Sequence, residues 1–190
     1  MADQIRVLGI AGSLRKHSVN KGLLCAAQTV LPEGMDLEIF DLKDIPLFNE
    51  DILTAGPPQS VLELKRRIAA ADGLLIAIPE YNFTIPGVLK NAIDWASRPV
   101  KDSPLVGKPV ALMGAGGIMG TVRAQLAFRQ MGPFLNLYIM NRPEVLVTRS
   151  WEKFDAEGKL KDEATLHAVR GLLEAFAGWV TRFRPHAVVS

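Results

Sequence analysis

Two short segments of this sequence are apolar at almost every position. Residues 73–79 read GLLIAIP and residues 110–113 read VALM. A strand in the middle of a parallel sheet has helices over both faces, so its side chains are apolar in both directions instead of alternating. These two segments therefore predict central strands of a parallel sheet, and they restrict the chain to an α/β fold.

The rest of the chain supplies the other parts of such a fold. Three further strands are predicted, at residues 6–10, 35–42 and 144–147. Residues 35–42 alternate between apolar and polar, as a strand near a sheet edge does. Apolar residues recur at helical spacing in five segments, at residues 18–31, 60–71, 86–97, 121–135 and 162–183. Ser60 and Glu63 have the spacing of a capping box, and residues 43–58 are predicted to be a long loop.

Strands that alternate with helices predict a five-stranded parallel sheet with helices on both faces. The order 2-1-3-4-5 places the two apolar strands centrally and the alternating strand at an edge. Ligands of such sheets bind beyond the carboxyl ends of the strands, near the point where the strand order reverses. Three loops rich in glycine or proline follow predicted strands at this edge, and they are the candidate binding loops.

Composition narrows the class of protein. The chain has 190 residues, 48% of them hydrophobic, and a net charge of +2, which predicts one domain over residues 1–190 and no nucleic-acid partner. Cys25 is the only cysteine, so an internal disulfide and a multi-cysteine metal site are excluded; we expect its thiol in the core. We also expect no secretion signal, no membrane partner and a cytoplasmic location, because no apolar run reaches the ~18 residues of a membrane span.

The first candidate loop, residues 12–20, reads GSLRKHSVN and opens the first predicted helix. The N-terminus of a helix presents unpaired N–H groups and a partial positive charge, which together bind phosphate. Ser13, Ser18 and Asn20 can donate to phosphate oxygens, and Arg15 can add a bidentate contact. The spacing matches neither a P-loop nor a dinucleotide fingerprint. The alternative is that Ser18 only caps the helix and Arg15 is solvated.

The second candidate loop lies at residues 79–87 and reads PEYNFTIPG. Two prolines stiffen it, its backbone can meet the polar edge of an isoalloxazine ring, and its aromatic residues can wall that ring. Glu80 is assigned to loop shape or to binding, because hydride transfer to a flavin needs no protein acid or base. The alternative is an ordinary loop in which Pro86 starts a helix.

The third candidate loop, residues 114–120, reads GAGGIMG. Several residues without side chains at the end of a strand can lie flat against a ligand ring or its ribityl chain. A tight strand-to-helix turn is the alternative interpretation.

Together, the motifs at residues 12–20, 79–82, 86–95 and 107–110 resemble the NADPH-dependent FMN reductase family of flavodoxin-like proteins. The likeness is strongest to its bacterial quinone and chromate reductase branch and extends from about residue 4 to residue 183. The resemblance implies a three-layer flavodoxin-like sandwich, a non-covalent FMN, and NADPH or NADH as cosubstrate. It assigns FMN binding to twelve residues: Ser13, Arg15, Ser18, Val19, Asn20, Pro79, Glu80, Tyr81, Asn82, Ala115, Gly116 and Gly117.

The resemblance also implies a homodimer or homotetramer with flavins near the subunit contacts. Arg123 and Glu144 stand where this branch forms ion pairs between subunits, and Leu126 replaces a tyrosine of that network. We expect Trp95, Phe128, Met131 and Phe134 to add apolar surface for association, although helical stripes such as these also face a core.

The predicted function is an FMN-dependent NAD(P)H oxidoreductase that passes electrons to quinones, free flavins, azo compounds or chromate-like oxyanions. The flavin supplies the chemistry, so no catalytic side chain and no metal ligand are predicted. Two alternatives stay open: a flavodoxin-type electron carrier, which the pI of about 8.8 disfavours, and a flavin-bound redox sensor with little turnover.

Overall fold

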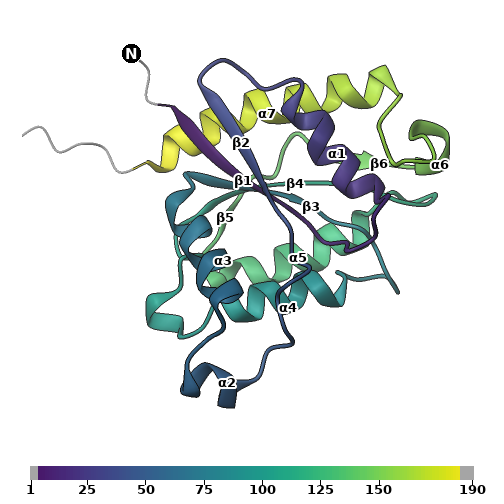
Figure 1. The fold of residues 1–190 in the computed structure, drawn as a ribbon. Helices are drawn as coiled ribbons and strands as arrows, with labels where there is room; N and C mark the ends of the chain where they lie inside the picture. Colours follow the sequence, from purple (N-terminus) through teal and green to yellow (C-terminus); the bar gives the residue numbers. More distant parts are fainter. Residues whose placement is uncertain (1–3, 185–190) are drawn as a thin grey trace, which may run out of the picture.

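The computed structural model describes residues 4–184, which form a parallel sheet between two layers of helices (Figure 1). The sheet has the order β2-β1-β3-β4-β5, as predicted, and β6 also pairs with β4. Its strands are β1 (Ile5–Ala11), β2 (Met35–Phe40), β3 (Gly73–Ala77), β4 (Pro109–Ala115), β5 (Tyr138–Ile139) and β6 (Val145–Val147). Every residue of β3 and β4 is buried, whereas β2 alternates buried and exposed positions over its first four residues. The sequence patterns therefore identified the central and edge strands correctly.

The fifth position of the sheet differs from the prediction, because two short strands share it. The strand predicted at residues 144–147 is β6, which pairs with the end of β4 from Met113 to Ala115. The start of β4 pairs instead with β5, at Pro109 and Val110. A strand of two residues is too short to show a periodicity, so the sequence pattern did not predict β5.

The helices α1 (Val19–Gln28) and α7 (Glu163–Phe183) cover one face of the sheet, and α3, α4 and α5 cover the other (Figure 1). The last three span Gln59–Ala70, Gly87–Ala96 and Val122–Leu135. Each layer has its own apolar core: Leu24, Leu173 and Phe176 are buried on the first side, and Leu64, Trp95 and Phe128 on the second. The strand residues alternate between these two cores, which is why β3 and β4 are apolar throughout.

Two helix starts show which capping predictions were correct. The Ser18 hydroxyl accepts hydrogen bonds from the backbone N–H groups of Asn20 and Lys21, so it is the N-cap of α1. The capping box of Ser60 and Glu63 was wrong, because α3 begins at Gln59 after Pro58 and has no side-chain cap. Proline sets the extended backbone that precedes a helix, and that constraint moved the start upstream.

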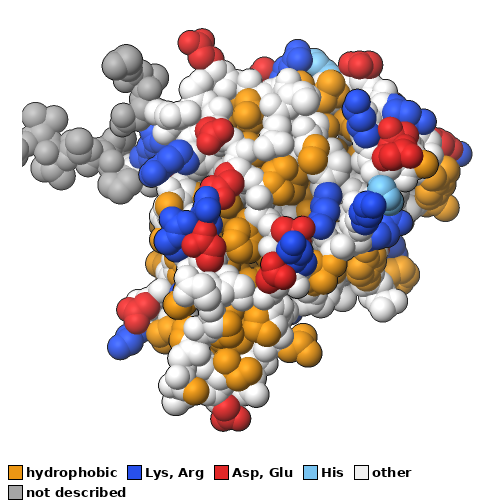
Figure 2. Space-filling view, in the orientation of Figure 1, with side chains coloured by type: hydrophobic (Ala, Val, Ile, Leu, Met, Phe, Trp, Pro, Cys, Tyr) orange, Lys and Arg blue, Asp and Glu red, His pale blue; other side chains and the backbone are white. Residues whose placement is uncertain are grey.

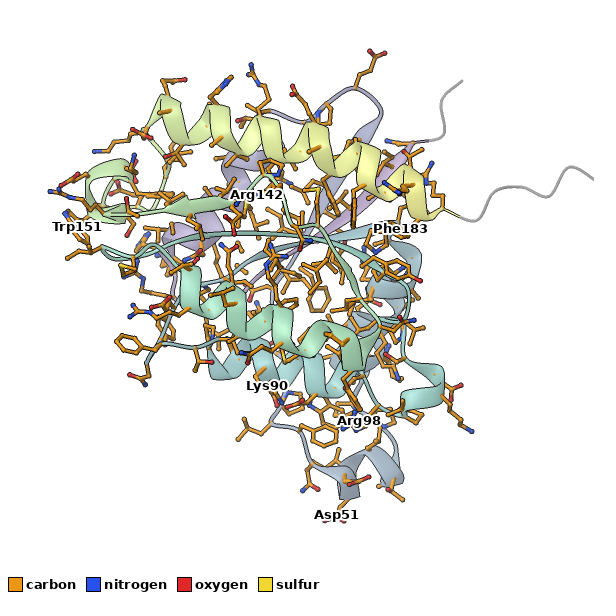
Figure 3. The ribbon with its side chains drawn as sticks, turned by 180° about the vertical axis from the view of Figure 1, so that it is seen from behind. Asp51, Lys90, Arg98, Arg142, Trp151 and Phe183 are labelled. Carbon is orange, nitrogen blue, oxygen red and sulfur yellow. The ribbon has the colours of Figure 1, made fainter. Side chains whose placement is uncertain are left out.

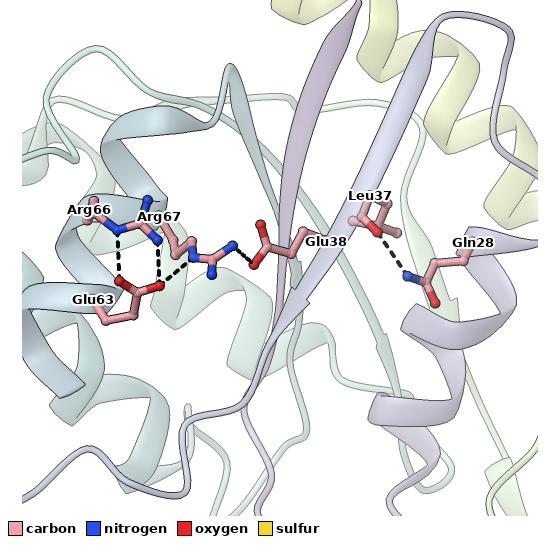
Figure 4. Close-up of polar contacts among 6 residues, drawn as sticks. All are labelled: Gln28, Leu37, Glu38, Glu63, Arg66 and Arg67. Atoms are coloured by element: carbon pink, nitrogen blue, oxygen red, sulfur yellow. Dashed lines mark hydrogen bonds and ion pairs between the residues drawn. The ribbon is translucent and has the colours of Figure 1, made fainter.

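Glu63 has a different role from the one predicted. Its carboxylate accepts hydrogen bonds from the guanidinium groups of Arg66 and Arg67, on the outer side of α3 (Figure 4). The hydrogen bonds from Arg66 and then Arg67 lower the pKa of Glu63 to about 2. Arg67 also pairs with Glu38 of β2, which ties α3 to the edge strand.

The predicted loop at residues 43–58 contains a short helix, α2 (Glu50–Ala55), that projects below the second helical layer (Figure 1). Asn49 caps it by accepting from the Asp51 N–H. Asn91 of α4 fixes the loop, because its amide accepts from the Phe48 N–H and donates to the Pro46 carbonyl. A six-residue helix with no buried residue gives no apolar stripe, so the composition of the segment predicted only a loop.

Several expected exposures also changed. Cys25 is exposed, contrary to the prediction, because it lies on the outer side of α1, away from the buried residues Leu23, Leu24 and Ala27. Trp95 and Phe128 are buried in the core and Met131 packs against it, so they do not offer surface for association. Phe134 is exposed, as that prediction required.

A short helix, α6 (Ser150–Lys153), was not predicted, and it carries the exposed Trp151. Figure 3 shows Trp151 and Phe183, the last residue of α7, at opposite ends of the molecule.

Candidate functional site

The three candidate loops meet at the carboxyl edge of the sheet, as the topology requires. They follow β1, β3 and β4, which are neighbours. The first loop is joined to the end of β3, because the Gly12 N–H donates to the Ala77 carbonyl at 2.9 Å. Strand order has thus brought together three segments that are far apart in the sequence.

Asn20 joins the first loop to the third. Its amide Nδ2 donates to the Ala115 carbonyl at 2.9 Å, and its Oδ1 accepts from the Ala115 N–H at 3.0 Å. Both residues are buried. The side chain therefore links α1 to the end of β4. The second hydrogen of its amide nitrogen remains available to a ligand.

The first loop is arranged to receive an anion. Ser13 and Ser18 are buried, and their hydroxyl oxygens accept from backbone N–H groups of the loop and of α1. An accepting hydroxyl keeps its own hydrogen for donation. In the described part of the chain, no acceptor meets the backbone N–H groups of residues 16–19. Unpaired N–H groups at the start of a ten-residue helix fit a phosphate group.

The charged residues of this loop are directed outward. Arg15 is exposed and donates from its guanidinium to the His17 carbonyl at 2.8 Å. Within the described residues, neither Arg15 nor Lys16 forms an ion pair with a carboxylate. Two positive charges at the mouth of the loop complement a phosphate. His17 is exposed, as predicted, and its Nδ1 lies 3.3 Å from the Glu157 carbonyl oxygen.

The second loop is a tight hairpin. The N–H groups of Tyr81 and Thr84 each donate to the other's carbonyl, at 3.1 and 3.0 Å. Between them, Asn82 and Phe83 have φ values of 49° and 66°, the left-handed conformation that a two-residue turn of this class requires. Asparagine tolerates this conformation, but for phenylalanine it is strained. The loop therefore has a defined shape that exposes Tyr81 and Phe83, which are 51% and 69% accessible.

Glu80 differs from the exposed aromatic residues of this loop, because its side chain is nearly buried. Its side chain is only 7% exposed and forms an ion pair with Arg123 of α5. The Arg123 guanidinium also lies 3.6 Å from the centre of the Phe83 ring. The resemblance placed Arg123 in a contact between subunits with Glu144, but within this chain Arg123 contacts Glu80, and Glu144 pairs with Arg142.

The third loop packs closely against its neighbours. A Cβ at Gly114 would lie 2.1 Å from the Thr121 Oγ1 and 2.4 Å from the Ile78 carbonyl oxygen, so only glycine fits where β4 passes the end of β3. Gly117 is exposed and has open space where a Cβ would be. The loop thus has a fixed base and an accessible backbone, which suits contact with a flat ligand.

The sequence patterns did not identify two supporting segments. The N–H groups of Arg149 and Ser150 donate to the carbonyls of Gly117 and Gly116 and hold the third loop in place. Gly158 has a φ of +83°, and a Cβ there would lie 3.0 Å from the His17 carbonyl. The turn that ends at Gly158 is a recognisable signal, but its contact with the first loop is tertiary.

A cavity of about 500 Å³ lies beside this site and is distinct from the edge that the three loops form. Its walls are the outer side of α1 and the residues 157–166, with Cys25 on the α1 side. It shares Lys16 and Ser18 with the first loop, and no residue of 79–84 or 114–120 lines it. The exposed loops form a shallow surface, so the predicted ring position and this cavity do not coincide.

The structure therefore brings together all twelve predicted residues along one edge, with different surroundings. Ser13, Ser18 and Asn20 are buried, whereas Arg15, Tyr81 and Asn82 are exposed. The donors of the first loop suit a phosphate group, and the hairpin and the third loop offer accessible backbone beside it. Within residues 4–184, no group of three His, Cys, Asp or Glu residues could hold a metal ion, and no helix is long and apolar enough to cross a bilayer.

Comparisons with known proteins point to one family. The family model described as NADPH-dependent FMN reductase matches residues 5–152. An NAD(P)H-dependent FMN reductase of Pseudomonas aeruginosa is 46% identical over 185 residues, which cover 97% of this chain and 100% of that protein. A quinone reductase of Escherichia coli K12 is 37% identical over 188 residues, covering 97% and 100% of the two chains. Among solved structures, the flavoenzyme FerB of Paracoccus denitrificans, an NAD(P)H:(acceptor) oxidoreductase, superposes with a TM-score of 0.85 at 34% identity, covering 94% and 98%.

Proposed function

The chain belongs to the NADPH-dependent FMN reductase family, and on that premise we propose that it passes electrons from NADPH or NADH, through bound FMN, to quinones and other small acceptors. It is a flavin-dependent oxidoreductase, and FMN is its cofactor. We propose that the whole chain forms one FMN-binding unit. The acceptors that we infer are quinones first, followed by free flavins, azo compounds and chromate-like oxyanions.

The single observation that carries the placement of FMN is the group of unpaired N–H groups at residues 16–19, in a loop that also holds the buried side chains of Ser13 and Ser18. In this proposal Ser13, Ser18 and the backbone hold the phosphate, and Arg15 closes over it from solvent. Val19 lies at the first position of α1, where the partial charge of the helix is positive. Asn20 contributes one amide hydrogen and keeps the loop against β4.

When bound, FMN would supply the redox chemistry between the nicotinamide and the acceptor. The chain's part is to bind and orient. Pro79, Tyr81 and Asn82 line one side of the ring, and the backbone from Ala115 to Gly117 lines another. Because Tyr81 and Gly117 are exposed, the site is open, and the nicotinamide and the acceptor can occupy the same place in turn. Such exposure supports a proposal of ping-pong exchange with several acceptors.

We also propose that the protein acts as a homodimer or homotetramer. Exposed apolar side chains occur in both ring-facing loops and on α5: Tyr81, Phe83, Ile118, Met119, Leu126 and Phe134. Apolar surface of this kind marks contacts between proteins, and Figure 2 shows apolar side chains among charged ones on the face it displays. A cytoplasmic location stays a prediction from the sequence.

The test of the activity is a coupled assay with the purified protein. Its visible spectrum is recorded, and oxidation of NADPH and of NADH is followed with a benzoquinone as acceptor, with and without added FMN. We expect a yellow protein and acceptor-dependent oxidation. A yellow protein that does not oxidise either nucleotide would instead be a carrier or a sensor, and a protein that neither binds FMN nor turns over would contradict the proposal.

Arg15→Ala tests the phosphate grip. We expect the affinity for FMN to fall about tenfold, the effect of losing one charge-assisted hydrogen bond to phosphate. The free energy of unfolding of the apoprotein should change by less than about 0.5 kcal/mol, because the side chain is exposed. Fluorescence titration with FMN and chemical denaturation measure the two quantities. An FMN affinity equal to that of the wild type would remove Arg15 from the site.

A further inference from the structure

Glu80 has an unusual position for an acidic residue of an exposed loop. It lies between Pro79, which is buried, and Tyr81, which is exposed. Its side chain is 7% exposed and turns away from the open side of the hairpin toward α5. A carboxylate that is nearly buried must be matched by donors, because its desolvation is costly.

The donors come from the start of α5. The first N–H groups of a helix have no partner within the helix, and the N-cap residue Thr121 provides no side-chain cap. The Thr121 Oγ1 instead accepts from the Gln125 amide at 3.2 Å. Glu80 provides the side-chain cap of α5, because its Oε2 accepts from the backbone N–H groups of Arg123 at 3.0 Å and Ala124 at 3.3 Å. A residue of the second loop thus caps the helix that follows the third loop.

The second carboxylate oxygen completes the contact. Oε1 accepts from the Arg123 Nε at 2.5 Å and pairs with the other side of the guanidinium. That guanidinium lies 3.6 Å from the Phe83 ring centre, within the range of a cation–π contact. The strained tip of the hairpin is therefore held by the same arginine that Glu80 binds.

We propose that Glu80 is a positioning residue that fixes the separation between the second loop, residues 79–84, and the third loop, residues 114–120. These loops form the two walls of the FMN ring site in the function proposed above, on which this inference rests. Glu80 acts through Arg123 and the backbone of α5, and it does not contact the flavin phosphate. Its removal should loosen both walls, so it should weaken recognition of the ring and leave recognition of the phosphate intact.

Two flavins separate the ring from the phosphate. Riboflavin has the ring without the phosphate, so a loss at the ring site affects riboflavin and FMN equally, and a loss at the phosphate site affects only FMN. The variants are Glu80→Gln, Arg15→Ala for the phosphate loop, and Glu63→Gln as a matched control. Glu63 is a suitable control because its carboxylate also binds arginines, on α3 and without contact to the loops (Figure 4).

For Glu80→Gln we expect the dissociation constants of FMN and riboflavin to rise by the same factor, about tenfold. The visible circular dichroism of bound FMN should change as the ring orientation relaxes. In the apoprotein, hydrogen exchange should increase at the amides of Arg123 and Ala124, where the cap is lost. Glu63→Gln should leave both flavin affinities within about twofold of the wild type.

Faster exchange at these amides with unchanged affinity for both flavins would overturn the proposal, as would a loss confined to FMN. If Arg15→Ala also leaves the affinity for FMN unchanged, the placement of the phosphate is wrong as well, and the proposed FMN site is contradicted. If Glu80→Gln does not fold, Arg123→Ala carries the test, because it keeps the backbone cap and removes only the guanidinium. Arg123→Ala should raise the dissociation constants of FMN and riboflavin about threefold. Unchanged affinities would again overturn the proposal.

Discussion

The phosphate loop at residues 12–20 and the ring loop at residues 79–84 follow adjacent strands, yet they are built in opposite ways. The serine and asparagine side chains of the first are buried and hydrogen-bonded to the backbone around them, as Ser18 and Asn20 show. The second exposes Tyr81 and Phe83 and holds two residues in the left-handed conformation.

The difference reflects what each loop must recognise. A phosphate group needs several donors at fixed positions, and buried hydrogen bonds hold such donors with little loss of entropy on binding. A flat ring with changing partners needs an accessible surface, and accessible residues add little to stability. The ring loop is held through the contact of its residue Glu80 with the start of α5. The phosphate loop, in contrast, is joined directly to the helix that it opens. Variants of the buried residues of the first loop should reduce both stability and cofactor affinity, and variants of the exposed residues of the second loop should reduce affinity alone.

The largest effect is expected for Asn20→Ala. It leaves the N–H and the carbonyl of Ala115 without their partner in a buried place, so the free energy of unfolding should fall by about 2–3 kcal/mol. Denaturant unfolding of the apoprotein measures this, and FMN affinity should fall as well. Gln28→Ala is the control on the same helix, because it removes a single amide hydrogen bond, to Leu37, and should cost about 1 kcal/mol. Equal losses of unfolding free energy in the two variants would show that the link from Asn20 to β4 contributes no more than a single ordinary hydrogen bond.

Tyr81→Ala, in the ring loop, should lower the affinity for FMN without lowering stability. The side chain is half exposed, so the free energy of unfolding should change by less than about 0.5 kcal/mol. The affinity for FMN should fall about fivefold, because stacking of an aromatic residue on a ring is worth about 1 kcal/mol. Titration with FMN and denaturation of the same preparation give both values. A variant that loses stability but keeps its affinity would reverse the comparison.

The smallest effect is expected for Asp162→Asn, which concerns the support of the phosphate loop. Asp162 caps α7, directly after the segment that brings Gly158 to His17. Hydrogen bonds from Thr165 and then Lys153 lower its pKa from 3.8 to about 2. A lowered pKa contributes stability that is present above the unfolded value and is lost as the pH falls through the folded value.

Asparagine keeps the cap but cannot ionise. From about pH 5 down to about pH 2, the unfolding free energy of the wild type should therefore fall more steeply than that of the variant. Urea unfolding at several pH values measures the two slopes. The difference should be small, because the carboxylate is partly exposed and therefore screened by solvent. Parallel slopes would show that this carboxylate contributes nothing to acid sensitivity.

Much of the fold could be predicted because its signals are local. The apolar runs of β3 and β4 and the alternation of β2 depend on which faces are covered, and each is visible within a few residues. The errors arose where the signal was too short or ambiguous. β5 and α2 have no periodicity to detect, and Ser60 has the correct spacing for a cap that Pro58 made unnecessary.

The sequence pointed to candidate site residues, which stay a prediction, but it gave no information on their orientation. Ser13 and Ser18 were chosen for their hydroxyls and are buried where the proposal needs them. Glu80 was assigned to loop shape or binding, but its contact with α5 was not foreseen, because its partner Arg123 lies 43 residues away in the sequence. Cys25 was misplaced for a related reason: on a helix of small residues, one position decides between the core and solvent.

The order of the first four strands, the layers of helices and the three loops at one edge were predicted from the sequence alone, because apolar periodicity and glycine and proline positions act over short distances. Only the tertiary structure decided the hydrogen bonds between Asn20 and Ala115 and the capping of α5 by Glu80. Their partners are set by packing between distant segments, where buried polar groups must find whichever donor or acceptor the fold brings within reach.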